Sequence, residues 1–407
     1  MALSHLGACS SLGSSWLVLS LLLGCAGAVC PLPDVSEGAQ LTTITFGGIA
    51  RSWYTFVPAS VAAAQAAVPL VIDLHGIYQC VTEGDAQIYT GWLKKAEEFG
   101  FIAVWPQAAD EPMGANGVTG FKWPERRGPI GARWNAGMCD ECNGFSYKGQ
   151  FVTCCVDAPD DAMAAPSNNA DDVGFLREVV AQVAAAHSVD RTRIYATGHS
   201  YGCVMAQRVL AQASDLVAAV ACFAGALTLA NDLGVTPLAK LSSEYTPRPL
   251  MVIHGNTDTV VPYDSASTFS ALSPDSPYAA LGAEGNLALW GRYNGCPGDA
   301  ATETPKDNYT LHEIDCNGVV SALVEVPGVG HYPLYNVGGV VSGLAHYKAT
   351  GQTTTASFDT TQLAWDFLKT ASINNCPAGC VSVNARQRRQ LLFGSIGAEC
   401  PEGCVPA

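Results

Sequence analysis

Short apolar runs alternate with amphipathic segments along most of the chain. Continuous apolar runs predict buried strands over residues 69–75, 101–106, 193–197, 216–224, 249–254 and 319–326. Apolar positions at helical spacing predict helices over residues 86–99, 171–187, 200–213, 280–293 and 357–372. Fully apolar strands that alternate with helices are typical of a mostly parallel sheet covered by helices on both faces. The pattern therefore predicts an α/β fold.

Three segments depart from this alternation. Residues 42–58 alternate around Gly47-Gly48 and predict a β-hairpin. Residues 108–170 are rich in Gly, Pro, Asp and Cys without clear periodicity, and predict a long Cys-containing loop insertion. The motif Cys-Pro-x-Gly-Cys occurs at residues 376–380 and again at 400–404, so residues 373–407 are interpreted as a separate Cys-rich tail. We expect one main domain over residues 29–372.

The N-terminus carries an apolar run, Trp16 to Cys25, followed by the small residues Ala-Gly-Ala. The run is too short to span a bilayer and predicts a secretory signal peptide over residues 1–28. A buried N-terminal helix and a bacterial lipoprotein box are the alternatives. Cleavage would remove Cys9 and Cys25 and leave an even number of the 16 cysteines, as expected of a disulfide-bonded, secreted, extracellular protein.

Composition narrows the classes of function. The net charge of −15 argues against a nucleic-acid partner, which requires clustered Lys and Arg. The hydrophobic content of 48% is sufficient for a folded core. Beyond the N-terminus we find no apolar run of 18 residues, so stable membrane insertion is not expected. Nothing in the sequence implies a protein partner.

The segment Gly198 to Gly202 reads Gly-His-Ser-Tyr-Gly. It lies between a predicted strand and a predicted helix, the context of a nucleophile elbow, which exposes a serine hydroxyl above the sheet. Ser200 is therefore the candidate nucleophile, and the helix N-terminus adds positive potential for a developing oxyanion. A glycine-rich turn without chemistry is the alternative.

A serine hydroxyl becomes an effective nucleophile only when a histidine base takes its proton and an acidic residue orients that histidine. In this arrangement the acidic residue follows the serine along the chain, and the histidine comes last. Asp258 comes just after the predicted strand 249–254, whereas Asp264 lies further along the loop. His331 follows the last predicted strand and two glycines, so a flexible loop can place its imidazole over the elbow. We predict a Ser200–His331–Asp258 triad. The other histidines after Ser200 are interpreted as structural: His254, His312 and His346.

An oxyanion hole requires two backbone N–H groups that point to one position. The first is expected from Tyr201, the residue after the nucleophile. The second is expected from the turn after strand 69–75, where Ile77 is the first choice and Tyr78 the alternative. We expect the insertion 108–170 to lie near this site.

These motifs together resemble the secreted esterases of carbohydrate esterase family 1, which include feruloyl and acetylxylan esterases, and the related poly(3-hydroxybutyrate) depolymerase-like enzymes. The matching segments follow the family's order: 74–76, 104–107, 134–137, 171–175, 198–202, 254–263 and 328–331. The resemblance implies an α/β-hydrolase fold and a serine carboxylic-ester hydrolase with the same triad. It also implies an ester-bearing polymer or oligomer as substrate, no cofactor or metal, and a Cys296–Cys316 disulfide.

The sequence departs from the family around the expected substrate mouth. Tyr332 and Pro333 follow the histidine, where the family often has Trp two residues on, and His199 stands where the family often has Leu. Tyr332 and His199 are therefore candidate substrate contacts. Trp123 and Trp134, in the insertion, are further candidates because their rings could stack on a sugar or an aromatic acid.

Several features stay open at this level. The group Cys139, Cys142, Cys154 and Cys155 could form a zinc site, although disulfides are favoured. Cys203 and Cys222 could pair or remain buried thiols. Asn308 begins a glycosylation sequon. Residues 386–389, Arg-Gln-Arg-Arg, suit either a solvated turn or a processing site.

Three functions compete with the polysaccharide esterase. They are an extracellular polyester depolymerase, a serine peptidase on the same scaffold, and a non-catalytic secreted binding protein that keeps a hydrolase scaffold.

Overall fold

The computed structural model describes the residues 38–64, 66–76, 81, 90–109, 134, 136, 144–147, 150–153, 170–230, 241–264, 278–335, 354–373, 380–382 and 404–406. The predicted signal peptide and most of both the insertion 108–170 and the tail 373–407 lie outside these residues. Within the described part, no helix combines the length and the apolar character needed to cross a membrane.

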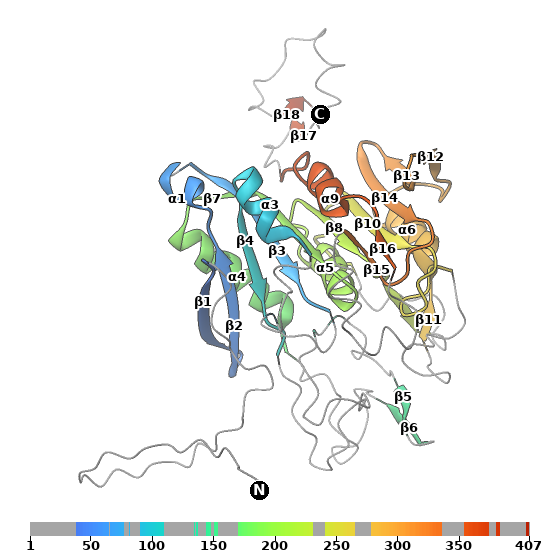
Figure 1. The fold of residues 1–407 in the computed structure, drawn as a ribbon, viewed down its shortest axis with the longest axis horizontal. Coiled ribbons are helices and arrows are strands. Elements are labelled where there is room, and N and C mark those ends of the chain that lie inside the picture. Colours follow the sequence, from blue (N-terminus) through green and yellow to red (C-terminus); the bar gives the residue numbers. More distant parts are fainter. Residues whose placement is uncertain are drawn as a thin grey trace, which may run out of the picture.

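Ten of the described strands form one sheet, drawn edge to edge across Figure 1. Their order is β1-β2-β4-β3-β7-β8-β10-β14-β13-β12. The bounds are β1 Gln40–Phe46, β2 Ile49–Phe56, β3 Val68–Leu74, β4 Ile102–Pro106, β7 Val189–Gly198, β8 Ala219–Phe223, β10 Leu250–Gly255, β12 Thr302–Pro305, β13 Thr310–Cys316 and β14 Val319–Val326. The run from β4 to β14 is parallel, and antiparallel strands flank it at both ends.

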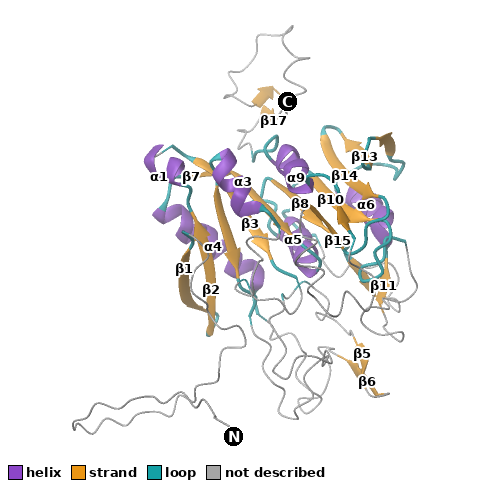
Figure 2. Cartoon of the chain, in the orientation of Figure 1, coloured by secondary structure: helices purple, strands orange, loops and turns teal. Residues whose placement is uncertain are grey.

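Helices cover both faces of this sheet (Figure 2). Their bounds are α1 Ala59–Ala64, α3 Trp92–Phe99, α4 Asp172–Ala186, α5 Tyr201–Gln212, α6 Gly282–Tyr293 and α9 Thr360–Leu368. Side chains of α1, α4, α5 and α6 pack in one large hydrophobic core, and those of α3 and α9 pack in a second. A smaller third cluster also contains side chains of α6. This arrangement confirms the predicted α/β-hydrolase fold, with a mostly parallel sheet between two helical layers.

Strand β3 illustrates why the central strands are apolar at nearly every position. Leu70, Ile72 and Leu74 enter the core that contains α5, whereas Val71 enters the core that contains α9. Successive side chains of a strand point to opposite faces, so a strand covered on both sides buries all of them. The continuous apolar runs in the sequence report this two-sided burial.

Local signals place several element ends. The turn of the predicted hairpin is Gly47-Gly48, and both residues have positive φ, of 57° and 79°. Asp171 caps α4 by accepting from the backbone N–H of Gly174 at 2.8 Å. Asp359 caps α9 in the same way, by accepting from Gln362 N at 2.8 Å.

Some elements differ from their predicted extents. Strand β7 begins at Val189 rather than at residue 193, because Val189 pairs with Val68 at the start of β3 and this pairing extends β7 through polar residues. The helix expected over 86–99 is described only from Trp92, and the closing helix ends at Leu368.

Four further pairs of strands lie outside the main sheet. In the insertion, β5 (Gly144–Tyr147) pairs with β6 (Gln150–Thr153), so this part is a hairpin rather than irregular loop. In the tail, β17 (Cys380–Ser382) pairs with β18 (Cys404–Pro406), which joins the ends of the twin Cys motifs. The remaining pairs are β9 (Thr228–Ala230) with β11 (Tyr278–Ala280), and β15 (Tyr332–Tyr335) with β16 (Thr355–Ala356).

Candidate active site

Ser200 occupies a sharp turn between β7 and α5. Its backbone has φ 57° and ψ −121°, a region that non-glycine residues rarely adopt. A Cβ at Gly198 would lie 2.5 Å from the carbonyl oxygen of Leu74, and a Cβ at Gly202 only 1.9 Å from it. Both flanking glycines are therefore required for the turn to pack against the end of β3, as the elbow motif predicts.

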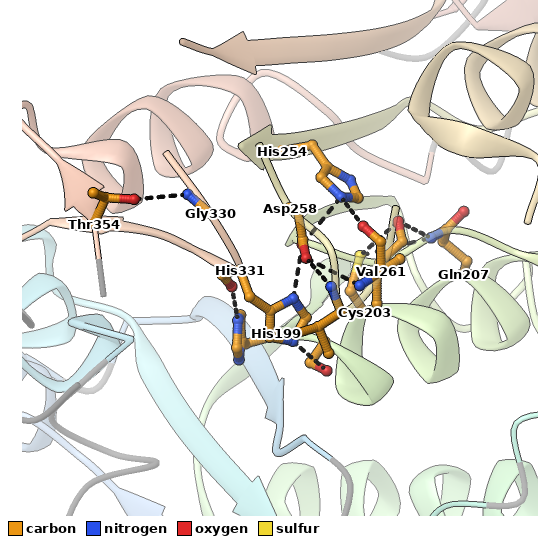
Figure 3. Close-up of polar contacts among 12 residues, drawn as sticks. His199, Cys203, Gln207, His254, Asp258, Val261, Gly330, His331 and Thr354 are labelled. Carbon is orange, nitrogen blue, oxygen red and sulfur yellow. Dashed lines mark hydrogen bonds and ion pairs between the residues drawn. The ribbon is translucent and has the colours of Figure 1, made fainter. Parts of the chain in front are cut away.

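Ser200, His331 and Asp258 meet at the carboxyl edge of the parallel strands β7, β14 and β10. Figure 3 shows the contact between His331 and Asp258. The imidazole Nε2 of His331 lies 2.9 Å from Ser200 Oγ, and its Nδ1 lies 2.7 Å from Asp258 Oδ2. All three side chains are buried; Ser200 has the largest exposed fraction, 8%. The structure thus brings together the three residues that were predicted from spacing.

Asp258 has an environment suited to a carboxylate. Its Oδ1 accepts from the backbone N–H groups of Val260 at 2.8 Å and Val261 at 3.0 Å. Burial acts to raise the pKa of Asp258, but the adjacent imidazoles of His331 and His254 outweigh burial and hold this pKa below its usual range. Asp258 is therefore ionised at neutral pH and accepts a hydrogen from Nδ1 of His331.

The loops that carry the acid and the histidine are tied to each other. Thr257 N donates to Val329 O at 3.0 Å, and Gly328 N donates to the side-chain Oδ1 of Asn256 at 2.8 Å. Gly330 N donates to Thr354 Oγ1 at 3.0 Å. These bonds fix the main chain just before His331.

Of the two backbone N–H groups predicted to form the oxyanion hole, the described residues include only that of Tyr201. Tyr201 opens α5 directly after Ser200, as expected, whereas Ile77 and its alternative Tyr78 lie outside the described residues. His75, which precedes them, accepts from Ala108 N at 3.0 Å through Nε2 and contacts Gly76 O at 2.7 Å through Nδ1. Burial lowers the pKa of His75 to about 4, so the ring is neutral and anchors the end of β3.

The structure places three of the four substrate-contact candidates in buried positions. The Trp134 side chain is 1% exposed, and its indole N–H donates to His75 O at 2.9 Å. His199 and Tyr332 are also buried, at 1% and 2% exposed. Their rings stack on each other with centroids 4.8 Å apart. Trp123 lies outside the described residues.

Two disulfides are present among the described cysteines. Cys296 is bridged to Cys316, as the family resemblance implied. Cys203 is bridged to Cys222, which decides between the two alternatives for this pair and ties α5 to β8 beside the elbow. The residues of the alternative zinc group lie outside the described part. Asn308 is exposed, in the turn between β12 and β13.

Sequence reasoning missed one close neighbour of the site. His254 was interpreted as a structural strand residue, yet its Nε2 lies 3.3 Å from Asp258 Oδ2 and 2.9 Å from Val261 O (Figure 3). The spacing of four residues across a strand end was the available signal. This spacing does not show whether the two side chains point toward each other. Only the bend of the chain at residues 255–258 turns the carboxylate of Asp258 back toward the imidazole of His254.

The sheet, the elbow and the Asp258–His331–Ser200 hydrogen-bond series are those of an α/β-hydrolase. No family model matches the chain. The chain is 28% identical over 265 residues to feruloyl esterase B of Piromyces equi, which covers 65% of this chain and 40% of that protein. It is 35% identical over 117 residues to the putative esterase NocK of Nocardia uniformis subsp. tsuyamanensis, which covers 29% of this chain and 31% of that protein.

The matched segments therefore span two fifths or less of the length of these curated relatives. Among solved structures, the chain is similar to an acetyl xylan esterase from Aspergillus awamori. The TM-score is 0.44 at 14% identity, with coverage of 72% of this chain and 94% of that one.

Proposed function

We propose that this protein is a secreted serine carboxylic-ester hydrolase that acts on the ester groups of plant-type polysaccharides, as a feruloyl or acetylxylan esterase would. The observation that carries the proposal is the continuous hydrogen-bond series from Asp258 through His331 to Ser200 at the nucleophile elbow. Similarity to a feruloyl esterase supports the reaction class and the choice of substrate. The two disulfides support an oxidising, extracellular location.

The first step is attack of Ser200 Oγ on the ester carbonyl carbon. Because ionised Asp258 only accepts hydrogen bonds, Nδ1 of His331 carries its proton and Nε2 presents a lone pair to the serine hydroxyl. The serine proton moves to Nε2 as the bond to carbon forms. Asp258 then stabilises the imidazolium and keeps the ring in the orientation that faces Ser200.

The oxyanion of the tetrahedral intermediate is assigned to two backbone N–H groups. Tyr201 supplies one at the N-terminus of α5, where the helix dipole favours negative charge. Ile77 is proposed to supply the other. The alcohol leaves with the proton from His331, and an acyl group remains on Ser200. Water then attacks the acyl carbon and gives a proton to His331, and the acid is released as Ser200 recovers its proton from His331.

The decisive experiment compares Ser200→Ala with Ser214→Ala. Ser214 is also a buried serine, but it lies at the far end of α5, where its hydroxyl accepts from Thr246 N at 2.9 Å. We expect Ser200→Ala to abolish hydrolysis of p-nitrophenyl acetate and labelling by a fluorophosphonate. Ser214→Ala should retain both. Esterase activity that survives in Ser200→Ala would overturn the proposal.

The substrate is tested by comparing methyl ferulate, acetylated xylan and short polyhydroxybutyrate. Release of ferulate or acetate, with polyhydroxybutyrate slower, is the expected result. Preference for the polyester would favour a depolymerase. A folded protein that neither hydrolyses esters nor reacts with fluorophosphonate would favour a non-catalytic binding protein.

A further inference from the structure

His199 lies directly before the nucleophile, in the connection between β7 and α5. Its backbone N–H donates to Leu74 O at 3.3 Å, and the residue forms a parallel bridge with Phe223, the last residue of β8. Both neighbours belong to central strands of the sheet. The main chain of His199 is therefore fixed to the rigid centre of the molecule.

The side chain of His199 reaches the loop that carries His331 (Figure 3). Its Nε2 lies 2.7 Å from the carbonyl oxygen of His331. A carbonyl oxygen only accepts, so Nε2 carries the hydrogen. Burial, followed by the nearby His331 imidazole, lowers the pKa of His199 to about 3, and the ring is thus a neutral donor across the pH range of an extracellular enzyme.

The ring also packs against two consecutive residues of that loop. It stacks on Tyr332 at 4.8 Å between centroids and lies 4.9 Å from the ring of His331. The side chain of His199 is 1% exposed. Its ring contacts the main chain and ring of His331 and the ring of Tyr332.

We propose that His199 is a positioning residue: its Nε2–H holds the main chain of His331 so that the imidazole stays within hydrogen-bond distance of Ser200. The ring of His331 makes polar contacts of its own, at 2.7 Å to Asp258 and 2.9 Å to Ser200. Rotation of the side chain alone can break those contacts, whereas the His199 bond fixes the backbone from which the ring projects.

This geometry couples the nucleophile to its base through adjacent residues. Ser200 and His199 are joined by one peptide bond, and the side chain of His199 is hydrogen-bonded to the His331 carbonyl. These two links set the distance from the serine to the His331 backbone. A displacement of about 1 Å in a reacting group costs about 100-fold in rate. This inference rests on the proposed function, because it assigns His331 as the base for Ser200.

The test compares His199→Gln with His199→Asn. The Gln side-chain nitrogen is as many bonds from Cα as Nε2 of histidine, so it can still donate to the His331 carbonyl, whereas the Asn nitrogen is one bond short. With p-nitrophenyl acetate, we expect kcat of His199→Asn to fall about 10- to 100-fold at nearly unchanged KM. His199→Gln should remain within about threefold of wild type.

Tyr195→Phe is the matched control. Tyr195 lies on β7, four residues before His199, and its buried hydroxyl donates to Ala371 O at 2.9 Å. The variant therefore also loses a bond from a buried side chain to a carbonyl. It should lower the melting temperature without lowering kcat. Fluorophosphonate labelling of Ser200, a readout of the Ser200–His331 pair, should slow in His199→Asn alone.

Two results would overturn the assignment. One is wild-type kcat in folded His199→Asn, and the other is an equal loss of kcat in the Gln and Asn variants. Ser200→Ala in the same assay separates the two hypotheses: an active Ser200→Ala defeats the proposed function. An inactive Ser200→Ala with fully active His199→Asn defeats only the role of His199. If His199→Asn does not fold, His199→Gln decides alone, and a loss there above about tenfold contradicts the proposal.

Discussion

Gly255, at the end of β10, should be required for the approach of the acid loop to the histidine loop. A Cβ placed there would lie 2.2 Å from Val329 O and 2.3 Å from Gly330 O. Heavy atoms in contact lie at about 3.5 Å, so Gly255→Ala must push the main chain before His331 away by roughly 1 Å. Both contacts are with backbone, which cannot rotate aside as a flexible side chain can.

The same displacement would separate Asp258 from His331. Their 2.7 Å contact would lengthen beyond the hydrogen-bond range, which ends at about 3.2 Å. Loss of a hydrogen bond to a charged group costs about 1.5–3 kcal/mol, which corresponds to roughly a 10- to 150-fold lower rate if it is expressed in the transition state. We therefore expect kcat of Gly255→Ala to fall by about one to two powers of ten.

The assay is hydrolysis of p-nitrophenyl acetate, with thermal denaturation to confirm that the protein folds. Gly298→Ala is the matched control, because a Cβ at Gly298 meets no atom within 4 Å. Its kcat and melting temperature should equal those of wild type. A Gly255→Ala variant with wild-type kcat would refute the argument that contact between the two loops sets the Asp258–His331 distance.

Three further changes test the electrostatics and the covalent links. Asp258→Asn, which leaves the geometry but no longer holds the His331 tautomer, should lower kcat by about 10³- to 10⁴-fold while the melting temperature changes little; a loss below tenfold would contradict the role of Asp258. Replacing Cys296 and Cys316 together by Ala should lower the free energy of unfolding by about 3 kcal/mol, because the bridge closes a loop with a sequence separation of 20, while kcat stays unchanged in urea-free assays. Burial lowers the pKa of His75 from 6.5 to about 4, so below pH 6.5 the unfolded chain binds protons that the folded chain excludes, and stability falls as the pH drops from 6.5 toward 4. Urea denaturation at pH 7 and pH 4.5 should show a smaller decline for His75→Gln than for wild type, and parallel declines would contradict this origin of acid sensitivity.

Much of the fold could be predicted because burial leaves a direct record in the sequence. Strand β3 is apolar at nearly every position since both of its faces are covered, and Asp359 marks the start of α9 by its capping side chain. Strand β7 shows the limit. Residues Asp190 to Arg193, just after its first residue, are polar, and only the pairing of Val189 with Val68 makes them part of the sheet.

The candidate triad could be predicted for the same reason. The elbow at Ser200 is a local motif, and Asp258 and His331 each follow a predicted strand whose parallel direction brings its carboxyl end to the same edge. Strand order along the chain was therefore sufficient to select these three residues, without any distance.

What the sequence by itself determined is thus the central apolar strands and most of the helices that cover them, their parallel arrangement and the three candidate residues at one edge. Only the tertiary structure decided the roles of residues whose contacts are distant in the chain. His199 and Trp134 are residue types that often contact substrates, yet both are buried. The imidazole of His199 bonds to the carbonyl of His331, and the indole of Trp134 bonds to the carbonyl of His75. The pairing of Cys203 with Cys222 is of the same kind. The physical reason is that hydrophobic periodicity reports whether a side chain is buried, whereas the partner of a buried ring or thiol depends on how separate elements pack together.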